Sequence, residues 1–225
     1  MNPSVALVIA AHPDDEVLGC GGTILALRRR GYTVNVAFMT DGESSRRTND
    51  LPLRREHRRR AALEASEVLG IRIVSWGDFP DNEMDSVSLL EVVKQIEGVI
   101  SETKPSLVIS HWHGDLNIDH QIVARAVLTA TRPHTSSTVK RVFAFEIPSS
   151  TEWAFGLSQV FTPNTFVDID NVFNQKMAAL ECYRDELREG FHPRSRDAIV
   201  ATSRRHGHTV GCAHAEALTL IRAVE

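Results

Sequence analysis

The sequence predicts an α/β fold in which a mostly parallel sheet carries helices on both faces. Short runs of aliphatic and β-branched residues alternate along the chain with longer segments whose apolar residues recur at helical spacing. The connections between them are short, so consecutive strands are joined through helices, as a parallel sheet requires.

The predicted strands are rich in Val, Ile, Leu and Phe, which fits a sheet buried on both faces. They cover residues 4–11, 32–39, 71–76, 106–110, 141–145 and 165–169. The predicted helices cover residues 16–30, 54–69, 87–103, 120–131, 171–188, 195–204 and 213–224. Glycines at 19, 21 and 22 fall inside a helical segment, which favours close packing against the sheet over a nucleotide-binding loop. This order of elements predicts a single Rossmann-like domain.

Length and composition limit the possible functions. The 225 residues fit a single domain, with a core at 1–147 and a loop-rich part at 148–225 that completes a pocket. The formal net charge of −4 argues against nucleic acid as a partner. The three cysteines have no paired spacing, so neither a disulfide framework nor a thiolate zinc site is expected. The sequence has no recognisable signal peptide or membrane span, so we expect a cytoplasmic protein. It is compatible with a homo-oligomer.

The first predicted strand ends in an imidazole and three carboxylates, His12-Pro13-Asp14-Asp15-Glu16. Open α/β sheets bind ligands at the carboxyl ends of their strands. Proline favours an extended backbone before it and fits the first turn of a helix, so His12 and Asp15 can converge across a strand-to-helix turn. Asp14 should then project differently, as suits a group that handles a water molecule. The alternative is that the carboxylates only cap the helix and complement its dipole.

A second polar cluster follows the strand at 106–110 directly. Residues 111–120, HWHGDLNIDH, contain three of the ten histidines. Burying several polar groups together is costly without a functional reason. Two imidazoles and one carboxylate with an open position are the ligands of a catalytic zinc, so His12, Asp15 and His120 are the predicted metal ligands. We expect Asp119 to accept the other N–H of His120.

The segments Ala11–Glu16 and Asn117–His120 resemble the PIG-L/LmbE-like family of zinc-dependent N-deacetylases. The resemblance extends over most of the chain. It implies one Zn²⁺ per chain held by His12, Asp15 and His120, with Asp14 as general base. It also implies a small-molecule substrate, an N-acylated amino sugar or sugar conjugate, that loses an acetyl or related acyl group.

The chain departs from the family where many members carry His-Pro-Asp-His. Asn117 stands at the first position, and asparagine can donate a hydrogen bond to an oxyanion but carries no charge. Either the metal and Asn117 stabilise the intermediate together, or His111 or His113 supplies a charged donor, and we favour His113. Both histidines could instead simply pack or bond within their loop.

The predicted substrate-binding residues are Arg59, Asp119 and His192. Arg59 lies where the family tends to place a sugar-binding arginine. Its neighbours Arg58 and Arg60 leave open which of the three arginines faces the pocket, and Arg59 could instead be an exposed residue of the helix. A guanidinium fork suits vicinal hydroxyls or a phosphate. His192, in the tail, either reaches the pocket or only fixes a loop.

Two other classes of protein fit part of this pattern. A non-haem iron enzyme, with Fe²⁺ in place of zinc, also uses two histidines and one carboxylate. A non-catalytic sugar- or nucleotide-binding module would have no need of Asp14.

Overall fold

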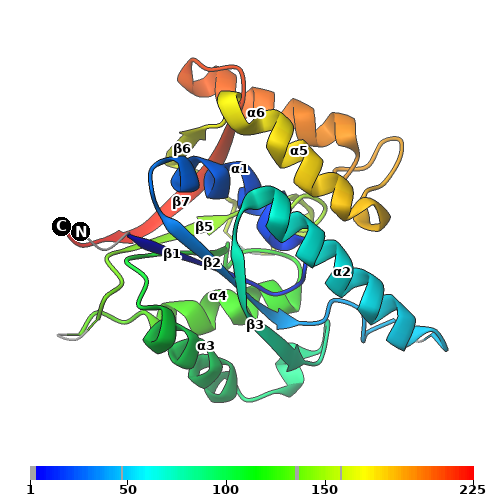
Figure 1. The fold of residues 1–225 in the computed structure, drawn as a ribbon, viewed down its shortest axis with the longest axis vertical. Coiled ribbons are helices and arrows are strands. Elements are labelled where there is room, and N and C mark those ends of the chain that lie inside the picture. The colour runs from blue at the N-terminus through cyan, green and yellow to red at the C-terminus, as the bar shows by residue number, and fades with distance from the viewer. Residues whose placement is uncertain (1–3, 47, 135–136, 158) are drawn as a thin grey trace.

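The computed structural model describes residues 4–46, 48–134, 137–157 and 159–225, and a sheet of seven strands runs through this part of the chain (Figure 1). The strands are β1 (Val5–Ala10), β2 (Thr33–Thr40), β3 (Arg72–Phe79), β4 (Leu107–His111), β5 (Arg141–Phe145), β6 (Thr165–Asp168) and β7 (Ala215–Ala223). Their order is β3-β2-β1-β4-β5-β7-β6. The first five in this order pair in parallel, and β7 runs antiparallel to both of its neighbours. The predicted fold class is confirmed.

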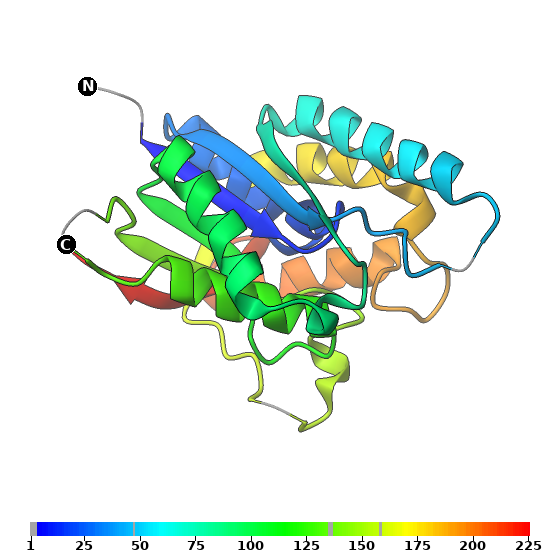
Figure 2. The ribbon, with the colours of Figure 1, turned by 90° about the horizontal axis from the view of Figure 1, so that it is seen from below.

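Helices cover both faces of the sheet (Figure 2). They are α1 (Asp15–Arg29), α2 (Leu51–Leu69), α5 (Phe173–Cys182) and α6 (Arg196–Val210) on one face, and α3 (Leu89–Thr103) and α4 (Ile118–Ala130) on the other. Because alternate side chains of a strand point to opposite faces, β1 contributes to both layers. Ala6, Val8 and Ala10 pack in the first layer, whereas Leu7 and Ile9 pack in the second. None of the described helices combines the length and the apolar character needed to cross a membrane.

One predicted helix is wrong. The segment predicted as a helix at 213–224 forms β7, which pairs with β5 and β6. Ala, Glu and Leu favour helices intrinsically, and these residues dominate the segment. The open edges of β5 and β6 override that preference, because β7 satisfies the backbone groups of both strands.

The predicted helix at 171–188 is shorter than expected. α5 ends at Cys182, and a short 3₁₀ helix, Arg184–Glu186, follows. Tyr183 turns inward at this point, is 2% exposed and donates its hydroxyl hydrogen to Glu16 Oε1 at 2.7 Å. The chain therefore leaves the helix early and carries Glu186 toward the carboxyl ends of the strands.

α1 is broken at Cys20, whose backbone (φ −150°, ψ 23°) is not helical. The glycines around the break let the helix approach the sheet closely, as predicted. A Cβ on Gly19 would collide with the ring of Phe145, and one on Gly22 would lie 2.7 Å from Ile169 Cγ2.

A buried ion pair holds the broken helix against the sheet. Glu216, on β7, accepts hydrogen bonds from the backbone N–H groups of Gly22 (2.8 Å) and Thr23 (2.6 Å). Lys176 Nζ lies 2.6 Å from Glu216 Oε1 and 3.3 Å from the carbonyl oxygen of Leu18. These contacts link the two halves of α1, whose first turn carries Asp15.

The substitution Glu216→Gln should destabilise the fold by about 3–5 kcal/mol, because it leaves the Lys176 ammonium buried without its charged partner. Urea unfolding measures this change. The control is Glu97→Gln, which breaks the exposed Lys94–Glu97 pair and should cost less than about 1 kcal/mol. Equal losses in the two variants would contradict a stabilising role for the buried pair.

Candidate functional site

The polar clusters at the ends of β1 and β4 meet because these strands are adjacent and parallel. Asn117 is the N-cap of α4, and its Oδ1 accepts hydrogen bonds from the backbone N–H groups of Asp119 (2.8 Å) and His120 (3.4 Å). This cap fixes the first turn of α4. It presents the His120 side chain to the turn that follows β1.

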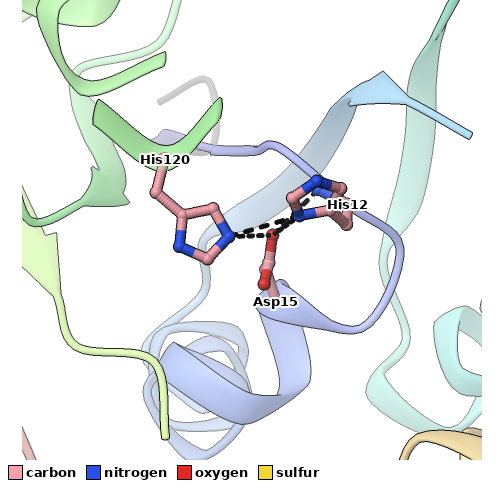
Figure 3. A group of neighbouring side chains, drawn as sticks. All are labelled: His12, Asp15 and His120. Atoms are coloured by element: carbon pink, nitrogen blue, oxygen red, sulfur yellow. Dashed lines mark hydrogen bonds and ion pairs between the residues drawn. The ribbon is translucent and has the colours of Figure 1, made fainter. Parts of the chain in front are cut away.

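Three side chains converge there, and Figure 3 shows them pointing at one another. His12 Nδ1, Asp15 Oδ2 and His120 Nε2 lie 3.2–3.5 Å apart pairwise. Ligands at about 2.1 Å from a common tetrahedral ion are separated by about 3.4 Å, so the spacing fits a small divalent cation. Asp15 Oδ1 is buried and has no hydrogen-bond partner among the described residues. This donor set can hold a metal ion.

Carboxylates support the far side of both imidazoles. His12 Nε2 lies 3.0 Å from Asp119 Oδ2 and 3.2 Å from Asp81 Oδ1. His120 Nδ1 faces Asp115 Oδ1 at 3.1 Å. Such partners fix the tautomer of a ligating histidine and leave its other nitrogen free for the ion.

The structure corrects the prediction for Asp119. This carboxylate is fully buried, and besides His12 it accepts backbone N–H bonds from Asn82 (2.6 Å) and Met84 (3.1 Å). It therefore supports His12 rather than His120, and its predicted role in binding substrate stays a prediction. Asp115 takes the place beside His120 that the sequence suggested for Asp119.

The cluster is arranged to hold positive charge. Burial would raise the pKa of Asp15, but the imidazoles of His120, His111 and His12 hold that pKa well below its usual range. Burial opposes charge on His120, yet Asp15 and Asp115 raise its pKa to about 9. A metal ion bound at His12 Nδ1 and His120 Nε2 would replace a proton on those two atoms and leave the protons that face Asp119 and Asp115.

His111 and His113 do not reach the cavity beside the triad. The buried His111 ring stacks on His120 with centroids 4.0 Å apart, and its Nε2 accepts the N–H of Ala11 at 2.9 Å. Burial, together with the charge of His120, lowers the pKa of His111 well below its usual value. His113 is exposed, with its Nε2 3.2 Å from Gln159 Oε1. The structure therefore does not bring His113 to the cavity, where its predicted role as a charged donor would place it.

A cavity of about 290 Å³ opens beside the triad, with His12, His120 and Asp14 in its lining. The arginine of α2 that lines it is Arg58, which is 6% exposed. Arg59, which was predicted to bind substrate, is exposed and stacks its guanidinium 4.4 Å from the ring centre of Trp76.

Asp14 lies between the triad and the arginines. Its φ of 138° is strained for a non-glycine residue, and its side chain lines the cavity together with His12 and His120. Its Oδ2 lies 3.3 Å from both Arg58 Nη1 and Arg194 Nη1. Burial raises the pKa of Asp14, although the two arginines act in the opposite direction.

Residues from the second half of the chain complete the cavity. His192 lines it, and its Nδ1 accepts the backbone N–H of Arg194 at 3.0 Å. Glu186, Arg188 and Arg194 also line it, and the sequence analysis singled out none of these three. Asn117 forms part of the opposite wall, where its Nδ2 donates to Asn82 Oδ1 at 2.9 Å.

A family described as GlcNAc-PI de-N-acetylase, PIG-L, matches residues 7–131, which is more than half of the chain. The chain belongs to the PIG-L family. The matched stretch runs from β1 to the end of α4 and contains all three residues of the triad.

Relatives of this PIG-L protein are deacetylases and a hydratase by name. A probable N-acetyl-alpha-D-glucosaminyl L-malate deacetylase of Bacillus cereus is 30% identical over 206 residues, covering 87% of this chain and 91% of the relative. A diacetylchitobiose deacetylase of Thermococcus kodakarensis is 31% identical over 196 residues, covering 81% and 70%. A 4-oxalmesaconate hydratase of Pseudomonas putida is 30% identical over 198 residues, covering 79% and 72%.

The fold is shared with a solved structure of similar size. A conserved protein from Thermus thermophilus matches with a TM-score of 0.78 at 25% identity, covering 98% of this chain and 96% of that one. The family assignment and the fold therefore agree, and an N-deacetylase with a His/Asp metal site is the supported class.

Zinc binding by variants should distinguish the three ligands of the triad from the residues around them. With zinc as the probe ion, the wild type should bind a stoichiometric amount, and His120→Ala should lose it because a ligand is removed. Asp119→Ala should weaken binding roughly 10–100-fold, since His12 loses its orienting partner. His113→Ala is the matched control and should bind like the wild type. Full zinc retention in the His120 variant would contradict the proposed ligand set.

Proposed function

We propose that this PIG-L family member is a zinc-dependent N-deacetylase, a hydrolase that removes an acetyl or related acyl group from an N-acylated amino sugar or sugar conjugate. The observation that carries the proposal is the convergence of His12, Asp15 and His120 beside a carboxylate, Asp14, that is not needed as a ligand. The names of the Bacillus and Thermococcus relatives support the choice of an amino-sugar substrate.

A divalent cation bound by the triad would polarise the amide carbonyl and acidify a water molecule. Asp14 then takes a proton from the water as its oxygen attacks the carbonyl carbon. The same carboxyl gives the proton to the departing nitrogen, and the C–N bond breaks to release acetate and the free amine. Arg58 and Arg194 hold Asp14 in position for both transfers.

Asn117 supplies the neutral donor for the developing oxyanion. Its Oδ1 is committed to the cap of α4, and its Nδ2 has a second hydrogen besides the one that it donates to Asn82 Oδ1. Preorganised donors of this kind contribute strongly in a site shielded from water. With His111 and His113 turned elsewhere, Asn117 carries this role alone among the three candidates.

The hydratase relative provides a second candidate function. The same acidified water and carboxylate could add water across a double bond conjugated to a carbonyl. The observation that favours it is the set of arginines lining the cavity, which suits an unsaturated polycarboxylate. Release of amine from N-acetylated sugars, compared with consumption of 4-oxalmesaconate by the same preparation, separates the two functions.

The substitution Asp14→Asn should leave zinc binding intact and lower kcat about 10²–10⁴-fold, because the amide cannot accept the proton of the water. Zinc content and the rate of amine release from N-acetylglucosaminyl L-malate and diacetylchitobiose measure the two effects. Full turnover by this variant would remove Asp14 from the mechanism.

Two substitutions at position 117 separate capping from donation. Aspartate and serine both cap helices well, so Asn117→Asp and Asn117→Ser should keep the stability of the fold. Both remove the Nδ2 donor and should lower kcat about 10²–10³-fold. Unchanged kcat in the serine variant would show that Asn117 acts only as a cap.

In this proposal residues 1–225 act as one unit, with the core at 1–147 and the part at 148–225 together forming the pocket. Cytoplasmic location and homo-oligomer formation remain predictions from the sequence.

A further inference from the structure

We propose that the part of the cavity lined by Arg46, Arg188 and Arg194 is a subsite for an anionic group of the substrate, a carboxylate or a phosphate, carried beyond the reacting amide. This inference rests on the proposed deacetylase function. It adds the chemical class of the group attached to the amino sugar.

Arg58 does not contribute to this subsite, because its guanidinium is already saturated. It pairs with Asp14, Glu43 and Glu186 and also donates to the carbonyl oxygen of Pro13. Its role is to hold the carboxylates around it.

Arg188 differs from Arg58 in having no charged partner. Its Nη1 donates to the carbonyl oxygens of Asp185 (2.8 Å) and Leu187 (3.2 Å). No carboxylate lies within ion-pairing distance of it among the described residues, and its Nε and Nη2 are without protein acceptors there. Arg188 is exposed, and a guanidinium held by one nitrogen can turn its other two nitrogens as a fork toward two anionic oxygens.

Two neighbouring arginines have donors to spare. Arg46 uses Nε and Nη2 on Glu43 and Glu186, and its Nη1 has no partner in the part of the chain that the structure describes. Arg194 uses Nε on Ser149 and Pro148 and Nη1 on Asp14 and Glu186, and its Nη2 has no partner among the described residues. All three arginines line the same cavity as the triad, so one ligand can reach both.

The charges in the cavity also favour an anion. Four arginines and three carboxylates, Asp14, Asp81 and Glu186, line the cavity. Glu43 pairs with Arg46 and Arg58 from outside the lining, so Arg188 is the arginine whose charge is left without a carboxylate partner among the described residues. Burial, with the positive charges of Arg188 and Arg194, lowers the pKa of His192 at the same rim. A neutral glycoside would leave the charge of Arg188 without a counter-charge, whereas a carboxylate or phosphate would be attracted by it.

The test compares probes that differ in charge at one position, using the zinc-loaded full chain. The probes are methyl N-acetyl-α-D-glucosaminide (neutral), N-acetyl-α-D-glucosamine 1-phosphate (phosphate) and N-acetyl-α-D-glucosaminyl L-malate (carboxylate). The wild type should prefer at least one anionic probe by roughly tenfold or more in kcat/KM. The larger preference identifies which anion the subsite takes.

Arg188→Ala should lower kcat/KM for the preferred anionic probe roughly 10–100-fold more than for the neutral probe, mainly through KM. Arg188→Lys should recover part of the loss, because it keeps the charge without the fork. Arg184→Ala is the matched control, since Arg184 is exposed on the same short segment. Equal use of neutral and anionic probes by the wild type, or an equal loss on all three probes in Arg188→Ala, would overturn the subsite.

Equilibrium binding separates failure of the subsite from failure of the deacetylase proposal. Calorimetric titration of inorganic phosphate and of L-malate into wild type and Arg188→Ala measures the subsite without turnover. Weaker binding of either anion in Arg188→Ala supports the subsite, even if no N-acetyl sugar releases amine and the deacetylase proposal fails. Equal binding of both anions by the two proteins overturns it.

Discussion

The parallel pairing of β1 with β4 is the constraint on which the site depends. Both strands are buried at the centre of the sheet, and their carboxyl ends lie at one edge. The turn after β1 supplies His12 and Asp15, and the cap of α4 supplies His120. A shift of one residue in this pairing would reverse the faces of the strand side chains, so the two hydrophobic layers also fix the register that aligns the triad.

The buried charges explain why the triad holds its shape. Asp81, Asp115 and Asp119 each face an imidazole of the triad, and each also accepts backbone or hydroxyl hydrogen bonds. Burying so many carboxylates is tolerable only because each is paired. Asp15 Oδ1, which has no hydrogen-bond partner among the described residues, is the exception, and a cation bound by the same carboxylate would compensate it.

The sequence predicted the fold and the triad because both depend on periodicity and on which residues follow a strand. It did not distinguish Arg58 from Arg59, because which of two neighbouring helix residues faces the cavity depends on how the helix is rotated against the sheet. The sequence suggested that Asp119 supports the adjacent His120, whereas its carboxylate lies beside the ring of His12. Arg188 and Glu186 lie in an irregular segment whose course is set by the inward turn of Tyr183, a tertiary contact with no local signal.

The central claim is that one divalent ion binds between His12, Asp15 and His120. Anomalous diffraction at the zinc edge from crystals grown with zinc tests it most directly. The account predicts a peak at about 2.0–2.2 Å from His12 Nδ1, Asp15 Oδ2 and His120 Nε2, with Asp119 outside the coordination sphere. A peak on the other side of the His12 ring, among Nε2, Asp81 and Asp119, would contradict it.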